Sequence, residues 1–227
     1  MRDATILFLT INLVPEQWRL FHREKLLEIV GDAPIITVSA KPMPDMPGIN
    51  LIQTPPFNVS NIYAQMLRAS KIATTKYIII VEDDTIYSQE HFKFRPEMDR
   101  FGYNMSRWGV LSWSKNPVYF YRHRESNSTL IAPRMLTIEC LEDRFKRYPG
   151  DSAEWMAGEM GKEKVERRFE TNYRSVKFHS NDPVVNFHHV NGIDKLEQSK
   201  RKSDRKALIA YDIPRWRDVS TLAKLFR

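Results

Sequence analysis

The sequence has 227 residues, of which 42% are hydrophobic, and a formal net charge of +7. A chain of this length and composition can bury one sizeable core, which excludes a wholly disordered protein. No apolar run approaches the roughly 18 residues of a membrane span, and the single cysteine, Cys140, excludes an internal disulfide. These features predict one cytoplasmic, enzyme-sized domain with no membrane partner.

The first half of the chain alternates strand patterns with helix patterns. Pro15 opens the first helix and Gly31 stops it, because proline suits the first helical turn and glycine suits the position after the last. Strands are predicted at residues 4–11, 35–39, 49–53 and 77–81, and helices at 16–30 and 60–73. Such alternation predicts an α/β fold with a mostly parallel central sheet flanked by helices.

The apolar run from Tyr77 to Val81 stops on three carboxylates, Glu82, Asp83 and Asp84. A run without a polar break predicts a central strand that is buried on both faces. Adjacent acids repel one another, and a fold tolerates that cost mainly where a cation lies opposite. Ligands of open α/β sheets bind at this carboxyl edge. The run therefore predicts a cation or ligand site, with a simple polar turn or helix cap as the alternative.

The sequence offers no glycine-rich cradle for the phosphates of a nucleotide. Its eight glycines are scattered, and neither the dinucleotide fingerprint nor the P-loop spacing occurs. Phosphates bound here would have to be neutralised in another way. A divalent cation that bridges a carboxylate and a diphosphate would do so with one or two side chains.

The second half of the chain is predicted to supply an acceptor site. Strand patterns cover residues 108–113, 118–122 and 128–132, and a helix pattern covers 134–148. Aromatic rings that alternate along a strand and are followed by arginines can stack a base and hold its phosphates, with ordinary core packing as the alternative. The candidate acceptor-binding residues are Trp113, Tyr119, Tyr121, Arg122 and Arg124.

Most of the positive charge lies near the C-terminus. Residues 195–227 hold ten Lys or Arg against four acids, a net charge of +6. Such clustering is typical of a protein that binds a polyanion such as DNA or RNA, and a solvated tail is the alternative. The residues predicted to contact a DNA backbone are Lys200, Arg201, Lys202 and Arg205.

Three segments together resemble a glycosyltransferase of the GT-A fold. They are Thr10-Ile11-Asn12 after the first strand, Asn58-Val59-Ser60-Asn61 at the second helix, and the run from Ile78 to Asp84. The acids stand where that family has its Asp-x-Asp type motif, although Glu82 takes the first position. The likeness is clear over about residues 4–92 and weaker to roughly 190. Three further segments, residues 12–16, 60–69 and 210–214, resemble uncharacterised bacteriophage glycosyltransferases of this group.

The resemblance implies a GT-A (Rossmann-like) domain at residues 1–194, with a nucleotide-sugar half at 1–92, an acceptor half at 93–194 and a basic segment at 195–227. It implies transfer of a hexose or pentose from a nucleoside-diphosphate sugar, UDP-linked, with Mn²⁺ or Mg²⁺. In that family the last acid binds the metal and the one before it lies near the ribose, roles that fall on Asp84 and Asp83. The other nucleotide-sugar candidates are Thr10, Asn12, Asn58, Ser60 and Asn61, the last three with helix capping as the alternative.

Two further roles follow from the resemblance. Family members often place a catalytic base at the start of a helix after the acceptor strands. Glu159, between glycines, is the first candidate, and Glu154 in a capping-box pattern is the second; a retaining enzyme needs no such base. Many members also return a late histidine to the metal. His189, at the open end of a strand at 184–189, is preferred to His188, because alternation lets only one of the two face the site.

Phage enzymes of this kind suggest that the acceptor is a 5-hydroxymethylated pyrimidine in double-stranded DNA, modified in the cytoplasm of the bacterial host. The basic segment and the arginines of the second half agree with a DNA partner. Two alternatives stay open. One is a GT-A enzyme that acts on a glycan, lipid or protein, and the other is a non-catalytic nucleic-acid-binding module whose acids only cap a turn.

Overall fold

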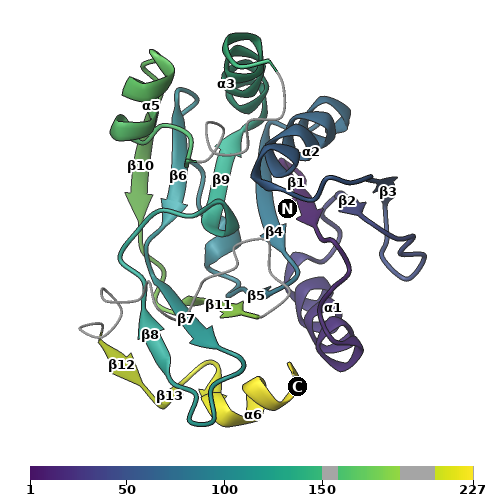
Figure 1. Ribbon diagram of the computed structural model, residues 1–227, viewed down its shortest axis with the longest axis vertical. Helices are drawn as coiled ribbons and strands as arrows, with labels where there is room; N and C mark the ends of the chain where they lie inside the picture. The colour runs from purple at the N-terminus through teal and green to yellow at the C-terminus, as the bar shows by residue number, and fades with distance from the viewer. Residues whose placement is uncertain (150–157, 190–207, 227) are drawn as a thin grey trace.

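The computed structural model describes residues 1–149, 158–189 and 208–226. Within these ranges a seven-stranded sheet forms the centre (Figure 1). Four of its six pairings are parallel, and the strand at residues 130–133 runs antiparallel to both of its neighbours. The predicted mostly parallel central sheet is confirmed. In spatial order the strands are β10 (Arg174–Phe178), β6 (Arg100–Asn104), β9 (Leu130–Pro133), β4 (Tyr77–Glu82), β1 (Ala4–Leu9), β2 (Ile35–Ser39) and β3 (Ile49–Ile52).

After the acids, the chain enters a second sheet. Its strands, in spatial order, are β12 (Ile209–Ala210), β8 (Tyr119–Tyr121), β7 (Arg107–Leu111), β11 (Val184–His188) and β5 (Thr85–Ile86). Only Asp83 and Asp84 separate the end of β4 from the start of β5. β5 pairs antiparallel with β11, and β11 pairs parallel with β7. The chain therefore passes from one sheet to the other at the acids.

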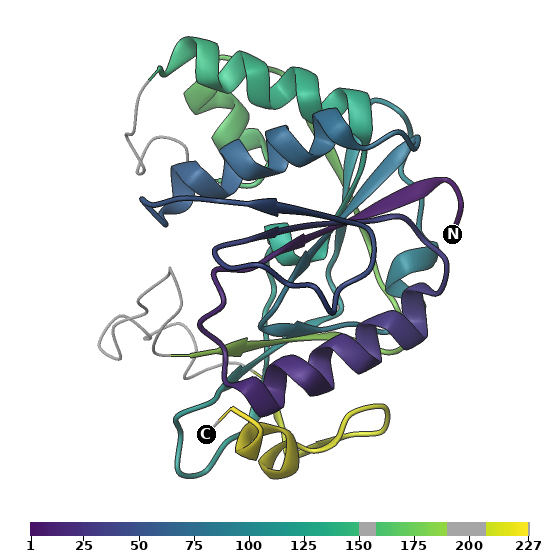
Figure 2. The same ribbon diagram turned by 90° about the vertical axis from the view of Figure 1, so that its right-hand side faces the viewer.

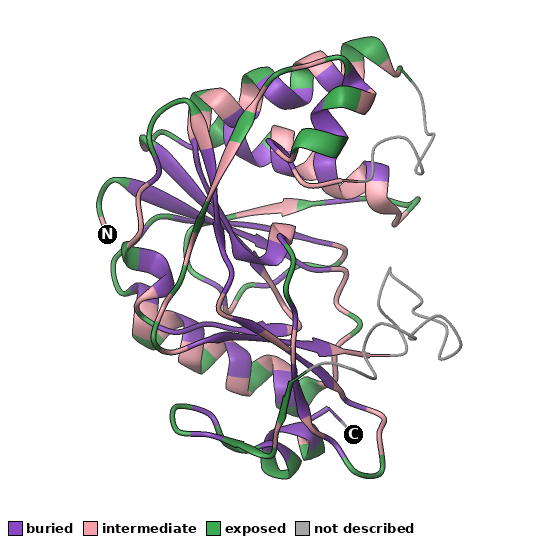
Figure 3. Cartoon of the chain, turned by 90° about the vertical axis from the view of Figure 1, so that its left-hand side faces the viewer, coloured by how far each residue is buried: buried purple, intermediate pink, exposed green. Residues whose placement is uncertain are grey.

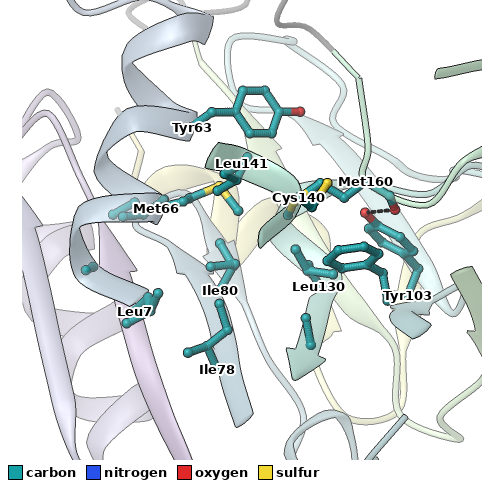
Figure 4. Packing of buried hydrophobic residues seen from close by; sticks show 14 of the residues in the cluster. Leu7, Tyr63, Met66, Ile78, Ile80, Tyr103, Leu130, Cys140, Leu141 and Met160 are labelled. Atoms are coloured by element: carbon teal, nitrogen blue, oxygen red, sulfur yellow. Dashed lines mark hydrogen bonds between the residues drawn. The ribbon is translucent and has the colours of Figure 1, made fainter. Parts of the chain in front are cut away.

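Helices cover both faces of the larger sheet (Figure 2). They are α1 (Glu16–Val30), α2 (Val59–Ile72), α3 (Arg134–Arg147) and α5 (Glu163–Phe169). Side chains alternate along a strand, so consecutive residues enter different clusters. Leu7 and Ile78 face α2, α3 and α5 (Figure 4), whereas Ile6 and Ile79 face α1. The sheet is thus buried on both sides, as the flanking helices of the predicted fold require.

β4 is buried along its apolar run, as predicted. In Figure 3 the strands at the centre of the molecule are mostly purple, which marks buried residues. The β4 residues from Ile78 to Val81 are 0% exposed. Burial of each such side chain stabilises the fold by about 1.5–3 kcal/mol. This packing offsets the cost of three adjacent carboxylates at the end of the strand.

Several predicted boundaries differ from the observed ones. β1 ends at Leu9 rather than Ile11, because the Asn12 N–H donates to Thr10 Oγ1 (2.8 Å) and closes a turn in which Asn12 has a φ of 57°. The predicted strand at 128–132 begins as a 3-10 turn, η2 (Asn127–Thr129), and becomes β9. β6 and β10 were not predicted. Glycine interrupts the apolar pattern of β6, and β10 is a partly exposed edge strand.

The last described segment, residues 208–226, joins the second sheet. It contains β12, a hairpin of β13 (Asp212–Ile213) and β14 (Arg217–Asp218), and the short helix α6 (Val219–Lys224). Its Trp216 and Phe226 enter a cluster with Trp18 and Phe187. Residues 190–207 lie outside the described part, so the predicted boundary at 194 stays a prediction. No helix in the described ranges is long and apolar enough to cross a membrane.

Candidate functional site

A cavity of about 320 Å³ opens at the carboxyl ends of β1 and β4. Its wall draws on both sheets, on α2 and on the loop before α5. The residues predicted for the site that line it are Thr10, Asn61, Asp83, Asp84, Trp113, Arg124, Glu159, His188 and His189. The structure therefore brings the predicted metal, nucleotide-sugar and catalytic candidates to one place.

The backbone of the acid turn is held from two sides. From α1, Trp18 Nε1 donates to the carbonyl oxygen of Asp83 (2.7 Å), and His22 Nε2 donates to that of Thr85 (2.8 Å). From β11, the Phe187 N–H donates to the carbonyl oxygen of Asp84 (2.7 Å). Burial lowers the pKa of His22 to about 4, so the ring is neutral near pH 7. These bonds fix the direction in which both carboxylates point.

Asp83 ends a chain of hydrogen bonds that starts at α2. The Thr10 hydroxyl donates to Asp83 Oδ2, and Gln53 Nε2 donates to the Thr10 carbonyl oxygen (2.7 Å). Asn61 Nδ2 donates in turn to Gln53 Oε1 (2.9 Å). Asn58 Oδ1 accepts from the Asn61 N–H (2.8 Å) and caps α2. The chain orders the polar side chains between α2 and the acids.

Two charge effects act on Asp83. Burial raises its pKa, the neighbouring Asp84 raises it further, and the pKa reaches about 7. A carboxyl in this state gains from a cation or from ligand hydroxyl groups that donate to it, because both favour the charged form. The environment therefore suits a polar ligand at Asp83.

Asn12, Asn58 and Ser60 do not line the cavity. Asn12 Oδ1 accepts from the Lys41 N–H (2.8 Å), which ties the turn after β1 to the loop after β2. Asn58 acts as the N-cap of α2, and Ser60 is buried in the first turn of that helix. The contact of Asn58 is that of the capping alternative, and the nucleotide-sugar role of all three residues stays a prediction.

Asp84 faces the cavity beside His189. Asn186 Nδ2 and the Thr85 hydroxyl both donate to Asp84 Oδ1 (2.9 Å each). Burial raises the pKa of Asp84, and the charge of His189 opposes that rise. Burial lowers the pKa of His189, and the charge of Asp84 opposes that fall. The pair thus offers a carboxylate oxygen and an imidazole nitrogen that already interact.

A divalent cation fits these donors. Carboxylate oxygen suits Mg²⁺ and Mn²⁺, and imidazole suits Mn²⁺. Among the described residues, no group of three or more His, Cys, Asp or Glu could hold a metal. A cation bound by Asp84 and His189 would therefore complete its shell from ligand phosphate and water, which is how Mg²⁺ is often held at phosphate sites.

We expect His189→Ala to raise the Mn²⁺ concentration at which the site is half saturated, by about 10-fold or more. The Asp84 carboxylate interacts with His189, whereas the His188 ring stacks on Phe120 at 5.9 Å between centroids. Mn²⁺ binding followed by electron paramagnetic resonance would measure the change. His188→Ala is the matched control. A shift from His188→Ala alone would reverse the assignment, and no shift from either would place both rings outside the metal shell.

Glu159 lies on the cavity wall, in a loop whose backbone is held by buried side chains. Gly158 and Gly161 flank it with φ angles of 138° and 79°. A Cβ at Gly161 would lie 2.5 Å from a backbone oxygen of Arg174, so glycine is required there. Lys162 Nζ lies 3.4 Å from Glu159 Oε2. The backbone thus approaches β10 closely while the carboxylate reaches the cavity.

Three buried side chains, Tyr63, Tyr103 and Arg144, hold the backbone of this loop, and we refer to them as the clamp. Tyr63 Oη (2.7 Å) and Arg144 Nη1 (2.9 Å) both donate to the Gly158 carbonyl oxygen. Tyr103 Oη donates to the Met160 carbonyl oxygen (2.9 Å; Figure 4). Arg144 is 0% exposed and is paired with Glu166 at 2.9 Å. This network fixes the position of Glu159 without touching its carboxylate.

The predicted acceptor residues fall into two groups. Trp113 and Arg124 line the cavity. Tyr119 is buried in the cluster that contains Trp18 and Phe187, and its hydroxyl donates to the Arg217 carbonyl oxygen (3.1 Å). Tyr121 packs edge-on against Trp108 at 5.6 Å between centroids, and the Arg122 guanidinium lies 5.5 Å from the Phe120 ring centroid. Glu154 and the four basic residues Lys200, Arg201, Lys202 and Arg205 lie outside the described residues.

The wall residues that were not predicted include Gln53, Arg107 and Asn186. Gln53 follows a strand as Thr10 does, so the argument about the carboxyl edge applied to it as well. Asn186 is two residues before His188 on the same strand face, and that spacing could have revealed it. Arg107 begins a strand inside the fold, and no local pattern marks such a position.

No protein family and no curated protein matches the sequence. Similar solved structures include Staphylococcus aureus TarS residues 1–349 with UDP-GlcNAc (TM-score 0.48, 13% identity, 83% of this chain and 59% of that chain). Others are the mannosyltransferase PcManGT from Pyrobaculum calidifontis with GDP-Man and Mn²⁺ (0.45, 11%, 84% and 58%) and a cytidylyltransferase for 2-C-methyl-D-erythritol 4-phosphate from Thermus thermophilus (0.45, 11%, 82% and 94%). The chain spans less than two thirds of the first two. TM-scores below 0.5 mark a likeness in outline only.

Proposed function

We propose that the protein is a GT-A type glycosyltransferase that moves a sugar from a nucleoside-diphosphate sugar to a hydroxyl group. The observation that supports it is one cavity wall that holds Asp83, Asp84, His189 and Glu159 together. Acids that only capped a turn would not need a histidine and a further carboxylate, on a separately held loop, around the same cavity. A mostly parallel sheet with its ligand site at the carboxyl edge agrees with this function.

Asp83, Asp84, Glu159 and His189 each have a role in this proposal. Asp84 and His189 would hold Mn²⁺ or Mg²⁺, which would supply Lewis-acid stabilisation of the leaving diphosphate. Asp83, ordered by Thr10, accepts hydroxyl groups of the nucleoside ribose. Glu159 takes the proton of the acceptor hydroxyl as that oxygen bonds to the anomeric carbon, the role of a general base in an inverting enzyme.

We further propose that the donor is UDP-linked and the acceptor a 5-hydroxymethylated pyrimidine in double-stranded DNA. Trp113 on the cavity wall offers a ring that can stack a base, and the exposed Arg124 on the same wall offers a guanidinium for a phosphate. The net charge of +6 in residues 195–227 favours a polyanion partner. A glycan, lipid or protein acceptor is the alternative within the same enzyme class.

One experiment tests donor and acceptor together. The protein would be incubated with Mn²⁺, a panel of nucleotide sugars, and either hydroxymethylated DNA or glycan acceptors, and the products analysed by mass. We expect a hexose or pentose on the hydroxymethyl group and free UDP. A modified glycan with unmodified DNA would overturn the DNA acceptor alone. Tight DNA binding without turnover of any nucleotide sugar would instead favour the non-catalytic nucleic-acid-binding module.

We expect Glu159→Gln to lower kcat by about 10²- to 10⁴-fold, the usual contribution of a general base. The affinity for UDP should stay unchanged, because the amide keeps the size of the side chain and the loop is held by its backbone. Glu163→Gln is the matched control, since its side chain is 84% exposed and pairs only with Arg167 on the described surface. Full activity in Glu159→Gln, with product of unchanged anomeric configuration, would indicate a retaining enzyme and remove the base.

A further inference from the structure

Arg107 is a buried cation on the cavity wall with unused donors. It begins β7, is 3% exposed and lines the cavity. Its Nε and Nη1 are buried and have no hydrogen-bond partner among the described residues. Arg144 also has a buried Nε without a partner, but its other nitrogens bind Gly158 and Glu166 and it does not line the cavity. An unpaired buried donor destabilises a fold unless something pairs with it.

The charges around Arg107 favour an anion in the cavity. Burial and the nearby Arg122 and Arg124 lower the pKa of Arg107 to about 10, and Glu82 and Asp84 oppose that fall. The guanidinium therefore stays protonated near pH 7. Three guanidinium groups repel one another there, and the acids do not accept hydrogen bonds from the two unused donors. A ligand with negative oxygens would relieve both effects.

We propose that Arg107 binds the diphosphate of the donor nucleotide and holds it as the leaving group. A guanidinium offers several N–H donors in fixed directions to phosphate oxygens, which the point charge of an ammonium does not. The identity of the ligand rests on the proposed function, whereas the anion site rests on Arg107 itself. A phosphodiester of DNA has the same oxygens, but a side chain that is 3% exposed suits a small ligand inside the cavity better than a duplex outside it.

This position gives Arg107 a part in the transfer step. As the bond between the anomeric carbon and the phosphate oxygen breaks, its electron pair moves to that oxygen. The acceptor oxygen bonds to the anomeric carbon, and its proton passes to Glu159. Negative charge therefore grows on the diphosphate next to the two donors of Arg107. Donors that are already oriented stabilise such charge more than water does, because they need not reorganise.

Calorimetric titration with inorganic pyrophosphate, UDP and uridine in buffer with EDTA tests the proposal. We expect the unaltered protein to bind pyrophosphate, and Arg107→Met to weaken both pyrophosphate and UDP by about 10- to 100-fold, the range for a charged hydrogen bond. Uridine affinity should not change. Arg107→Lys, which keeps the charge but not the fixed directions of the guanidinium donors, should give an intermediate loss. Arg134→Met is the matched control, because Pro133 pairs with Tyr77 and places Arg134 at the opposite end of β4 from the acids.

The outcomes separate this inference from the proposed function. Equal pyrophosphate affinity in the unaltered protein and in both Arg107 variants would overturn it, and so would a loss confined to DNA binding. Where Arg107→Met does not fold, by circular dichroism, the comparison rests on Arg107→Lys. Pyrophosphate binding that depends on Arg107, in a protein that transfers no sugar, would keep the anion site and remove the glycosyltransferase.

Discussion

Asp84→Asn should abolish sugar transfer and leave the free energy of unfolding almost unchanged. The amide keeps the size of the side chain and an oxygen that can still accept from Asn186 and Thr85, but it is a poor ligand for Mn²⁺. Loss of one group that stabilises charge at the reacting centre typically costs about 10²- to 10³-fold in kcat. Burial raises the pKa of Asp84, so the folded state disfavours its charge. A neutral replacement of the same size therefore adds no cost to folding.

Initial rates with Mn²⁺ and urea unfolding would be measured side by side. EDTA should cause the same loss in the unaltered protein, and added Mn²⁺ should restore activity there but not in the variant. Asp99→Asn is the control, because the Asp99 side chain is 68% exposed and lies before β6. Near-normal turnover of Asp84→Asn would remove the metal assignment. Loss of activity together with loss of folding would make Asp84 a structural residue.

Arg144→Met should destabilise the protein by about 3–5 kcal/mol. Glu166 is 3% exposed, and removal of its partner leaves a buried charge uncompensated, which is the costly way to break a buried ion pair. The Arg144 guanidinium also lies 4.5 Å from the Phe169 ring centroid and holds the Gly158 carbonyl oxygen. The loop that carries Glu159 should loosen as well, so kcat should fall even at temperatures where the variant is folded.

Urea titration would show this as a lower midpoint with an unchanged slope. The double variant Arg144→Met, Glu166→Gln should recover part of the loss, because it buries no unpaired charge. Arg147→Met serves as control on the same helix, since Arg147 is 39% exposed and pairs with Asp143 at 3.6 Å. Exposed pairs of this kind contribute about 0.2–1 kcal/mol. Equal losses from Arg144→Met and Arg147→Met would show that the buried pair adds nothing.

The parts of the fold that the sequence predicts are those with a local cause. β4 was predicted because an unbroken apolar run ending in charge needs no distant partner to be recognised. The same holds for the Gly31 stop of α1. β6 and β10 depend on each other, since they pair along their whole length, and neither has a pattern of its own. Long-range pairing of this kind leaves little trace in a short stretch of sequence.

The site was predicted to the extent that its residues follow strands. Thr10, Asp83 and Asp84 come directly after apolar runs, so the carboxyl-edge rule applied to them. Tyr119 and Tyr121 alternate as predicted, but alternation alone does not say which strand face meets the cavity. Arg107 and the Arg144 clamp are recognisable only by burial, and burial of a charged side chain is set by tertiary packing that the sequence pattern does not contain.

The acids occupy the two-residue link between the sheets, and this has a mechanical consequence. The larger sheet and the second sheet pack around different clusters, so the link at Asp83 and Asp84 is one of the places where they are joined. A ligand that contacted both Asp83 and Arg107 would link the two sheets. Binding of that kind stabilises by about 2.7 kcal/mol at a ligand concentration 100 times Kd. Amide hydrogen exchange should slow across β5, β7 and β11 together when a ligand fills the cavity, because the ligand then links the two sheets.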